Sequence, residues 1–182
     1  MSEPTGRPDP PPRLLVFAGL PGTGKSSLAR AVAERLGAVW LRVDSVEAAL
    51  LESGLPRSFE TGLAAYVVVR SLARDHLALG RDAVIDAVNG VEEARSMWRS
   101  LAAETGARRF VVEVVLSDRA EHRRRVESRA GSTPPLPAPT WDEVERREYL
   151  PWTEPRLPVD GGRPVVENVA RVLAYVAPSG PT

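Results

Sequence analysis

Short apolar runs alternate with stretches of helical periodicity along this sequence. The first run, Arg13–Ala18, is continuously apolar and stops at a glycine, which is typical of a strand buried on both faces of a sheet. Lys25–Leu36 follows with apolar residues three and four positions apart, and Gly37 is a natural end for this helix. The same reasoning predicts the other elements, with strands at 38–43, 82–88, 109–116 and near 157–160, and helices at 45–52, 58–79, 92–105, 118–129, from residue 140 and at 165–176.

Strands and helices that alternate in this way indicate a parallel sheet with helices on both faces. We therefore predict an α/β fold in three layers, with a five-stranded parallel sheet, in a single domain over residues 13–177. The proline-rich residues 1–12 and the last residues, 178–182, are expected to be disordered tails. Ligands of such sheets bind beyond the carboxyl ends of the strands, so the functional residues are expected at that edge.

The turn between the first strand and the first helix reads Gly19-Leu-Pro-Gly-Thr-Gly-Lys-Ser26 and matches the phosphate-loop pattern G-x-x-x-x-G-K-[ST]. Its glycines let the backbone curl so that N–H groups point at phosphate oxygens, and the helix N-terminus adds unpaired donors. We expect Lys25 to reach the β- and γ-phosphates and the Ser26 hydroxyl to bind Mg²⁺. The predicted nucleotide-binding residues are Gly19, Pro21, Gly22, Thr23, Gly24, Lys25, Ser26 and Ser27.

This loop predicts a nucleoside triphosphate and Mg²⁺, but it does not define the reaction. A GTPase of the usual kind needs an Asn-Lys-x-Asp element for base recognition, and Lys25 is the only lysine of the chain. A motor or remodelling ATPase usually has an apolar strand closed by Asp-Glu and a further helical domain, and the sequence shows neither. The pattern therefore favours a small ATP-dependent kinase.

A kinase needs a carboxylate near the γ-phosphate to orient the acceptor hydroxyl and take its proton. Asp44 lies at the predicted end of the second strand and is our candidate for this base. Arg42 is two residues earlier, on the same face of a strand, and could hold the acceptor beside Asp44. The alternative is that Asp44 serves only to begin the next helix together with Ser45, the expected N-cap.

A second polar group follows the third predicted strand. Asp86 ends the apolar part of this strand, where a carboxylate can hold Mg²⁺ through water, and it is also a candidate for contact with substrate. Asn89 is a substrate-binding candidate, with an Asn-Gly turn of positive φ as the alternative. Arg95 is a further substrate-binding candidate on the next helix, with a solvent-facing position left open.

The helix at 118–129 is rich in arginine and precedes a proline-rich loop, so residues 119–140 could form a lid. Arg125 and Arg129 lie four residues apart on one helix face and could stabilise the transferring phosphoryl group as catalytic residues. The alternative is a solvated helix held by salt bridges, which is usual for a charge run. Arg146 and Arg147 are weaker candidates, and His76 and His122 are expected to lie on helix surfaces.

The overall composition limits the classes of partner and chemistry that we expect for this protein. Lysine and arginine together number 24, as do aspartate and glutamate, so no basic surface indicates a nucleic acid partner. The absence of cysteine excludes thiol nucleophiles and thiolate zinc sites. No apolar run approaches the ~18 residues of a membrane helix, and the N-terminal residues lack a signal-peptide core, so we expect a cytoplasmic protein without membrane contact. The sequence does not define an oligomeric state.

Over residues 13–176 the sequence resembles the small P-loop kinases of the AAA_33 or zeta-toxin-like group, which are related to polynucleotide kinase domains and chloramphenicol phosphotransferase. Polynucleotide kinases end the strand after the phosphate loop in Asn-Arg-Asp, whose aspartate is the general base; 41–44 (Leu-Arg-Val-Asp) is similar, with the arginine displaced by one position. Their Asp-Thr-Asn, Arg and Trp are matched here by Asp86, Asn89, Arg95 and Trp98, with slightly different spacing. Their two lid arginines correspond to Arg125 and Arg129.

Our first hypothesis is therefore a kinase that moves the γ-phosphate of ATP, with Mg²⁺, to a hydroxyl of a small molecule. The second is a polynucleotide 5′-hydroxyl kinase, against which the balanced charge argues. The third is a non-enzymatic ATP-binding module. The sequence does not name the acceptor.

Overall fold

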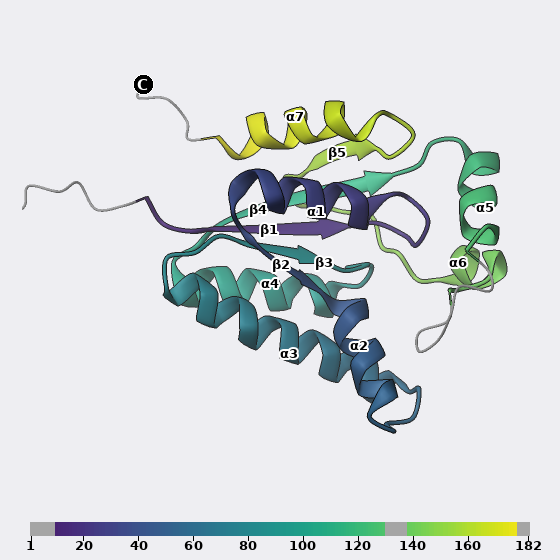
Figure 1. Cartoon of the computed structure of the whole chain (residues 1–182), viewed down its shortest axis with the longest axis horizontal. Coiled ribbons are helices and arrows are strands. Elements are labelled where there is room, and N and C mark those ends of the chain that lie inside the picture. Colours follow the sequence, from purple (N-terminus) through teal and green to yellow (C-terminus); the bar gives the residue numbers. More distant parts are fainter. Residues whose placement is uncertain (1–9, 130–137, 178–182) are drawn as a thin grey trace, which may run out of the picture.

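The structure of the chain is a computed structural model that describes residues 10–129 and 138–177 (Figure 1). Within these residues, β1 (Arg13–Ala18), β2 (Val39–Arg42), β3 (Ala83–Asp86), β4 (Arg108–Val115) and β5 (Leu157–Asp160) form one sheet in the order β2-β3-β1-β4-β5. Every neighbouring pair is parallel, which confirms the predicted five-stranded parallel sheet. Residues 1–9 and 178–182 of the predicted tails, and 130–137 of the predicted lid, lie outside the described residues.

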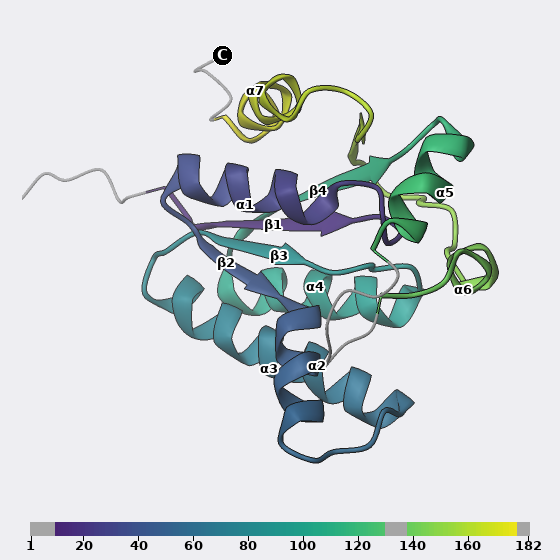
Figure 2. The same ribbon diagram turned by 45° about the vertical axis from the view of Figure 1, so that its right-hand side comes forward.

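Helices cover both faces of the sheet, as predicted (Figures 1 and 2). On one face lie α1 (Lys25–Leu36) and α7 (Val165–Val176), and on the other α3 (Phe59–Ala78) and α4 (Glu92–Thr105), with α2 (Val43–Glu52) packed beside α3. Successive residues of β1 point to opposite faces: Leu14 and Val16 pack on the α3–α4 side, whereas Leu15 and Phe17 pack on the α1–α7 side. The buried strand predicted for Arg13–Ala18 thus lies between two cores.

Two short helices, α5 (Arg119–Glu127) and α6 (Trp141–Arg146), stand beyond the carboxyl ends of the strands (Figure 1). The expected capping box opens α6, where the Thr140 hydroxyl and the Glu143 carboxylate each bond the other residue's backbone N–H. Val126, Trp141 and Val144 form a small apolar cluster that also contacts Leu20 of the phosphate loop. The helices of the described part of the chain include none that is long and apolar enough to cross a bilayer.

The end of β2 differs from the prediction. β2 stops at Arg42 and α2 begins at Val43, so Asp44 lies in the first turn of a helix and not on a strand, and Ser45 is not the N-cap. The physical reason is that β2 is an edge strand whose residues are all half-buried, so the sheet constrains its end weakly. Arg42 takes the N-cap position without a side-chain hydrogen bond.

Candidate functional site

A cavity of about 350 Å³ lies at the carboxyl end of the sheet. Its walls come from four parts of the chain that are far apart in sequence: the phosphate loop, the end of β2 with the first turns of α2, the segment after β3, and the segments around α5 and α6. The fold brings together here five residues with predicted catalytic, metal-binding or substrate-binding roles: Lys25, Ser26, Arg42, Asp44 and Arg129. The other lining residues are Leu20, Pro21, Gly22, Gly24, Ser27, Ser45, Ala48, Val88, Val126, Ala138 and Pro139.

The phosphate loop has the backbone that an anion site needs. Gly22 and Gly24 have φ of 89° and 92°, a region that L side chains rarely adopt, and α1 begins directly after Gly24. The loop therefore curls in front of a helix N-terminus, where unpaired N–H groups and the helix dipole favour phosphate. Gly19 and Thr23 support the loop from behind: the Gly19 N–H donates to the Val88 carbonyl, and the Thr23 hydroxyl donates to the Leu20 carbonyl.

A buried ion pair lies behind the loop. The Lys25 ammonium is 2.6 Å from Oδ1 of Asp86, and the two side chains are 7% and 0% exposed. The other oxygen, Oδ2, has no hydrogen-bond partner; Nε of Arg42, 3.7 Å away, is likewise buried and unpartnered. An unsatisfied buried carboxylate oxygen is costly, so Asp86 fits a cation or a cation-bound water as its further partner.

The oxygen atoms near the phosphate loop are of the kind that binds Mg²⁺. The Ser26 hydroxyl lines the cavity, and Asp86 supplies the unpartnered oxygen. Oxygen donors of this kind suit Mg²⁺, which is usually held by one or two protein groups together with waters and nucleotide phosphates. Among the described residues there is no cluster of three or more His, Cys, Asp or Glu side chains that could hold a metal by itself. The residues present therefore fit a cation that arrives with a nucleotide.

Arg42 lies between two carboxylates. Its guanidinium is 3.7 Å from Oδ2 of Asp86 through Nε and 3.7 Å from Oδ2 of Asp44 through Nη2. Asp44 is 41% exposed and lines the cavity from the first turn of α2. Glu47, which sequence reasoning missed, follows three residues later on α2; burial, and the charge of Asp44, raise its pKa.

Asn89 is placed differently from the prediction. Its side chain is fully buried, its Nδ2 donates to the Phe17 carbonyl at 2.9 Å, and its Oδ1 accepts from Nε1 of Trp98 at 2.8 Å. Its φ is 52°, which matches the alternative of an Asn-Gly turn. Asn89 thus joins the end of β3 to the end of β1, and this position does not support the substrate-binding prediction.

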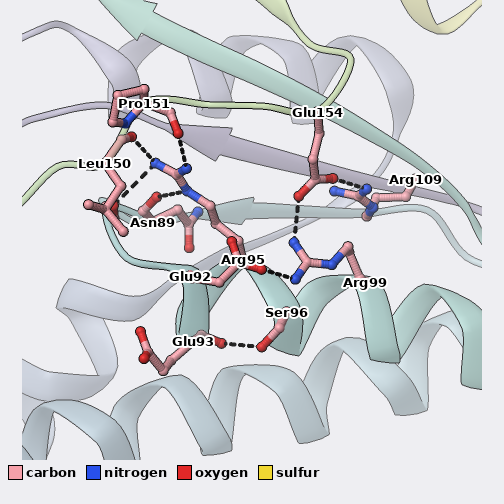
Figure 3. A network of polar contacts seen from close by, with 11 residues as sticks. Asn89, Glu92, Glu93, Arg95, Ser96, Arg99, Arg109, Leu150, Pro151 and Glu154 are labelled. Atoms are coloured by element: carbon pink, nitrogen blue, oxygen red, sulfur yellow. Dashed lines mark hydrogen bonds and ion pairs between the residues drawn. The ribbon is translucent and has the colours of Figure 1, made fainter.

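Arg95 is also a structural residue (Figure 3). Its guanidinium donates to the backbone carbonyls of Asn89, Gly90, Leu150 and Pro151 at 2.5 to 3.2 Å, and the side chain is only 3% exposed. It also lies 3.9 Å above the ring centroid of Trp152. Because these groups occupy the guanidinium, Arg95 does not support the predicted contact with substrate; it clamps the loop after β3 to the segment after α6.

The two arginines of the predicted lid have different surroundings. Arg129 lines the cavity, whereas Nε of Arg125 donates to Glu121 at 2.6 Å and Nη1 donates to the Gly161 carbonyl at 2.9 Å. Arg125 therefore connects α5 to the loop after β5, directly beside Gly24 of the phosphate loop. Hydrogen bonds from Arg124 and Arg125 lower the pKa of Glu121 to about 2.

His122 was expected on a helix surface, but it is buried against the phosphate loop. Its Nε2 is 2.7 Å from the Pro21 carbonyl oxygen, and its ring meets that of Trp141 edge-on. Sequence offered no signal for this contact, because the helical periodicity of the arginine-rich helix is too weak to define its buried face.

Comparison with known proteins places the chain in a family. The AAA_33 family, described as an AAA domain, matches residues 14–151. An uncharacterized protein of Mycobacterium tuberculosis strain H37Rv is 36% identical over an alignment of 104 positions; the match covers 51% of this chain and only 21% of that protein's length.

Solved structures show the same fold. The APS kinase CysC of Mycobacterium tuberculosis, in complex with AMPPNP and APS, has a TM-score of 0.71 and 22% identity, over 92% of this chain and 98% of that one. A gluconokinase from Sinorhizobium meliloti 1021 has a TM-score of 0.65 and 21% identity, over 90% of this chain and 91% of that one. The fold is thus that of the P-loop kinases, and because the family match covers more than half of the sequence, the chain belongs to the AAA_33 family.

Proposed function

We propose that this protein is a kinase that uses ATP and Mg²⁺ to phosphorylate a hydroxyl group of a small molecule. The observation that carries the proposal is that Lys25, Arg42 and Asp44 line the same cavity as the phosphate loop, with Asp86 buried directly behind Lys25 and Arg42. An accessible carboxylate such as Asp44 beside that group can orient a bound hydroxyl and accept its proton.

Each residue has a separate task in this reaction. The loop amides and Lys25 bind the phosphates, and Ser26 and Asp86 hold Mg²⁺, directly and through water respectively. Mg²⁺ would neutralise charge on the β- and γ-phosphates when bound. Lys25 is bonded to Asp86 here, so its ammonium already lies beside the predicted phosphate site.

Asp44 is the proposed general base. The acceptor oxygen forms a bond to the γ-phosphorus while the bond from that phosphorus to the β–γ bridging oxygen breaks, and ADP leaves. The acceptor proton passes to the Asp44 carboxylate and then to solvent. Arg42, 3.7 Å from Asp44, orients the carboxylate, and Arg129, with Arg125 beside the loop, stabilises charge on the transferring group.

The neighbouring folds agree with this proposal without naming the acceptor. The APS kinase was solved with AMPPNP, an ATP analogue, and both it and the gluconokinase are kinases. The zero net charge supports a small acceptor over a nucleic acid strand, which normally needs a basic groove.

A transfer screen tests the proposal. The protein is incubated with MgATP and pooled small-molecule alcohols (sugars, nucleosides, amino sugars and antibiotics), with a 5′-hydroxyl oligonucleotide as a separate arm. Mass spectrometry then reads the gain of one phosphate. We expect one compound class to gain phosphate with wild-type protein and none to do so with Asp44→Asn. Phosphorylation of the oligonucleotide alone would replace the small-molecule proposal, and tight ATP binding with no product in any arm would favour a binding module.

A further inference from the structure

His122 connects α5 to the phosphate loop through one hydrogen bond. Its side chain is buried, and its Nε2 lies 2.7 Å from the carbonyl oxygen of Pro21. Because a carbonyl oxygen can only accept, Nε2 must carry the hydrogen and donate it. On its other side the ring packs edge-on against Trp141 of α6, at 5.2 Å between centroids and 85° between planes. The ring is therefore held between a second helix and the loop.

This hydrogen bond fixes the orientation of a peptide group. The C=O of Pro21 and the N–H of Gly22 belong to the same planar peptide and point in opposite directions when the peptide is trans. With the carbonyl directed at His122, the N–H of Gly22 is directed away from α5. Gly22 lines the cavity, so this is the orientation in which its N–H can meet a phosphate oxygen.

The peptide needs such a constraint because glycine alone does not supply one. Gly22 has φ of 89°, and glycine accepts positive and negative φ with similar ease, so the φ preference of Gly22 does not by itself oppose rotation of the Pro21–Gly22 peptide. The rotated peptide would turn a carbonyl oxygen toward the bound phosphates, and two groups of negative charge would then face each other.

The packing of α5 supports the same role. A Cβ atom on Gly22 would lie 2.6 Å from Cγ2 of Val126 and 3.1 Å from Cδ2 of His122. The outer side of the loop is thus in direct contact with α5. Of these two neighbours only His122 offers a hydrogen-bond donor, so it is the group that selects the peptide's orientation.

We infer that His122 is a positioning residue for nucleotide binding: its Nε2–H holds the Pro21–Gly22 peptide with the Gly22 N–H toward the phosphates. The inference rests on the nucleotide-binding part of the proposed function and is independent of the acceptor.

Two substitutions separate the hydrogen bond from packing. His122→Phe keeps a ring against Trp141 but has no donor, and His122→Gln places an amide nitrogen near the position of Nε2. Dissociation constants are measured for MgATP, for inorganic tripolyphosphate and for adenosine. We expect His122→Phe to weaken MgATP and tripolyphosphate about three- to tenfold, the effect of one net hydrogen bond, and to leave adenosine unchanged. His122→Gln should restore most of the loss, and the control His76→Phe, in the last turn of α3, should not change any of the three.

The outcomes separate this inference from the proposed function. Equal affinity of wild type and His122→Phe for tripolyphosphate would overturn the role of His122, as would an equal loss for all three ligands, which indicates a loosened fold. Failure of wild-type protein to bind MgATP would overturn the proposed function itself, and this role with it. A measurement that needs no variant is the long-range ¹⁵N–¹H spectrum of His122: a hydrogen on Nε2 supports the inference, and a ring with a hydrogen only on Nδ1 overturns it.

Discussion

The ammonium of Lys25 and the carboxylate of Asp86 lie 2.6 Å apart in a site from which solvent is almost excluded. Charges in such a site stabilise each other strongly, but each has lost its hydration, so removal of one partner leaves the other uncompensated. Arg42 is also near, with Nε 3.7 Å from Asp86. A lone Asp86 would therefore keep a cationic neighbour, whereas a lone Lys25 would face another cation.

This asymmetry predicts different costs for the two single substitutions. Asp86→Ala should lower the free energy of unfolding by about 3 kcal/mol or more, and Lys25→Met by less, because Arg42 compensates only Asp86. The double variant should be more stable than Asp86→Ala alone. Urea unfolding without nucleotide measures all three, and equal losses for both single variants would contradict the role of Arg42.

Lys25 also predicts an effect on nucleotide chemistry. Lys25→Arg keeps the charge, but a planar guanidinium cannot replace a compact ammonium between two phosphates. We expect a large loss of MgATP affinity or phosphoryl transfer, while circular dichroism shows an intact fold. Arg35→Lys on the exposed side of α1 is the matched control. Full activity of Lys25→Arg would show that a cation of any shape suffices.

Asp44 has a testable role in transfer. Asp44→Asn removes the base with little change of volume, so we expect the rate of transfer to fall by a factor of about 10² to 10⁴ while the dissociation constant for MgATP changes no more than a few-fold. Glu47→Gln, on the same helix, is the comparison. If Asp44→Asn retains the wild-type rate and Glu47→Gln does not, the base is Glu47.

The phosphate loop and the sheet could be predicted because their signals are local. These signals follow one another directly in the sequence: the apolar run of β1, then the spaced glycines and the lysine of the phosphate loop, then the apolar positions of α1. The order β2-β3-β1-β4-β5 could not be predicted, because it depends on which strands pair with β1. The hydrophobic periodicity of a strand does not indicate which strand is its neighbour.

The side-chain roles at the edge of the site were harder to predict for a physical reason. Arg95 and Asn89 follow the strand at the positions where ligand-binding residues are common. Their partners are nevertheless Trp98 and backbone carbonyls, several of which are far away in the sequence. Buried polar residues that hydrogen-bond to the backbone and exposed polar residues that bind a ligand are of the same amino-acid types, so the sequence does not distinguish them. Only the three-dimensional position of residues such as Leu150 and Pro151 separates them.

Glu121 gives a pH prediction with a definite sign. Its pKa is lowered from 4.5 to about 2 by its bonds to Arg124 and Arg125, so the folded state holds the proton more weakly than the unfolded state. The contribution of these pairs to stability is therefore complete above about pH 4.5 and is lost as the pH falls through 2. The carboxyl ¹³C resonance of Glu121 should titrate near 2 in the wild type. It should move toward 4.5 when Arg124 and Arg125 are both replaced by glutamine, and no movement would contradict the assigned cause.

Substitution of Arg95, even by another cation, should lower the stability of the fold. The guanidinium donates to four carbonyls on two segments and stacks on Trp152. Lysine keeps the charge, but its single nitrogen cannot reach donors spread over a plane, so some carbonyls would lose their partner. We expect Arg95→Lys to lower the free energy of unfolding by about 3 kcal/mol, against a change within about 0.5 kcal/mol for the exposed control Arg35→Lys.

The position of the Arg95 clamp also predicts an effect on nucleotide binding. Arg95 bonds the Asn89 carbonyl, and the Asn89 side chain in turn bonds the Phe17 carbonyl at the end of β1, directly before the phosphate loop. Loss of the clamp should therefore weaken MgATP binding in Arg95→Lys, although Arg95 does not line the cavity. Hydrogen exchange should show faster exchange of the amides at 89–91 and 150–152 than in the wild type. Unchanged exchange in both segments, together with unchanged stability, would mean that the backbone of these segments holds the contact without Arg95.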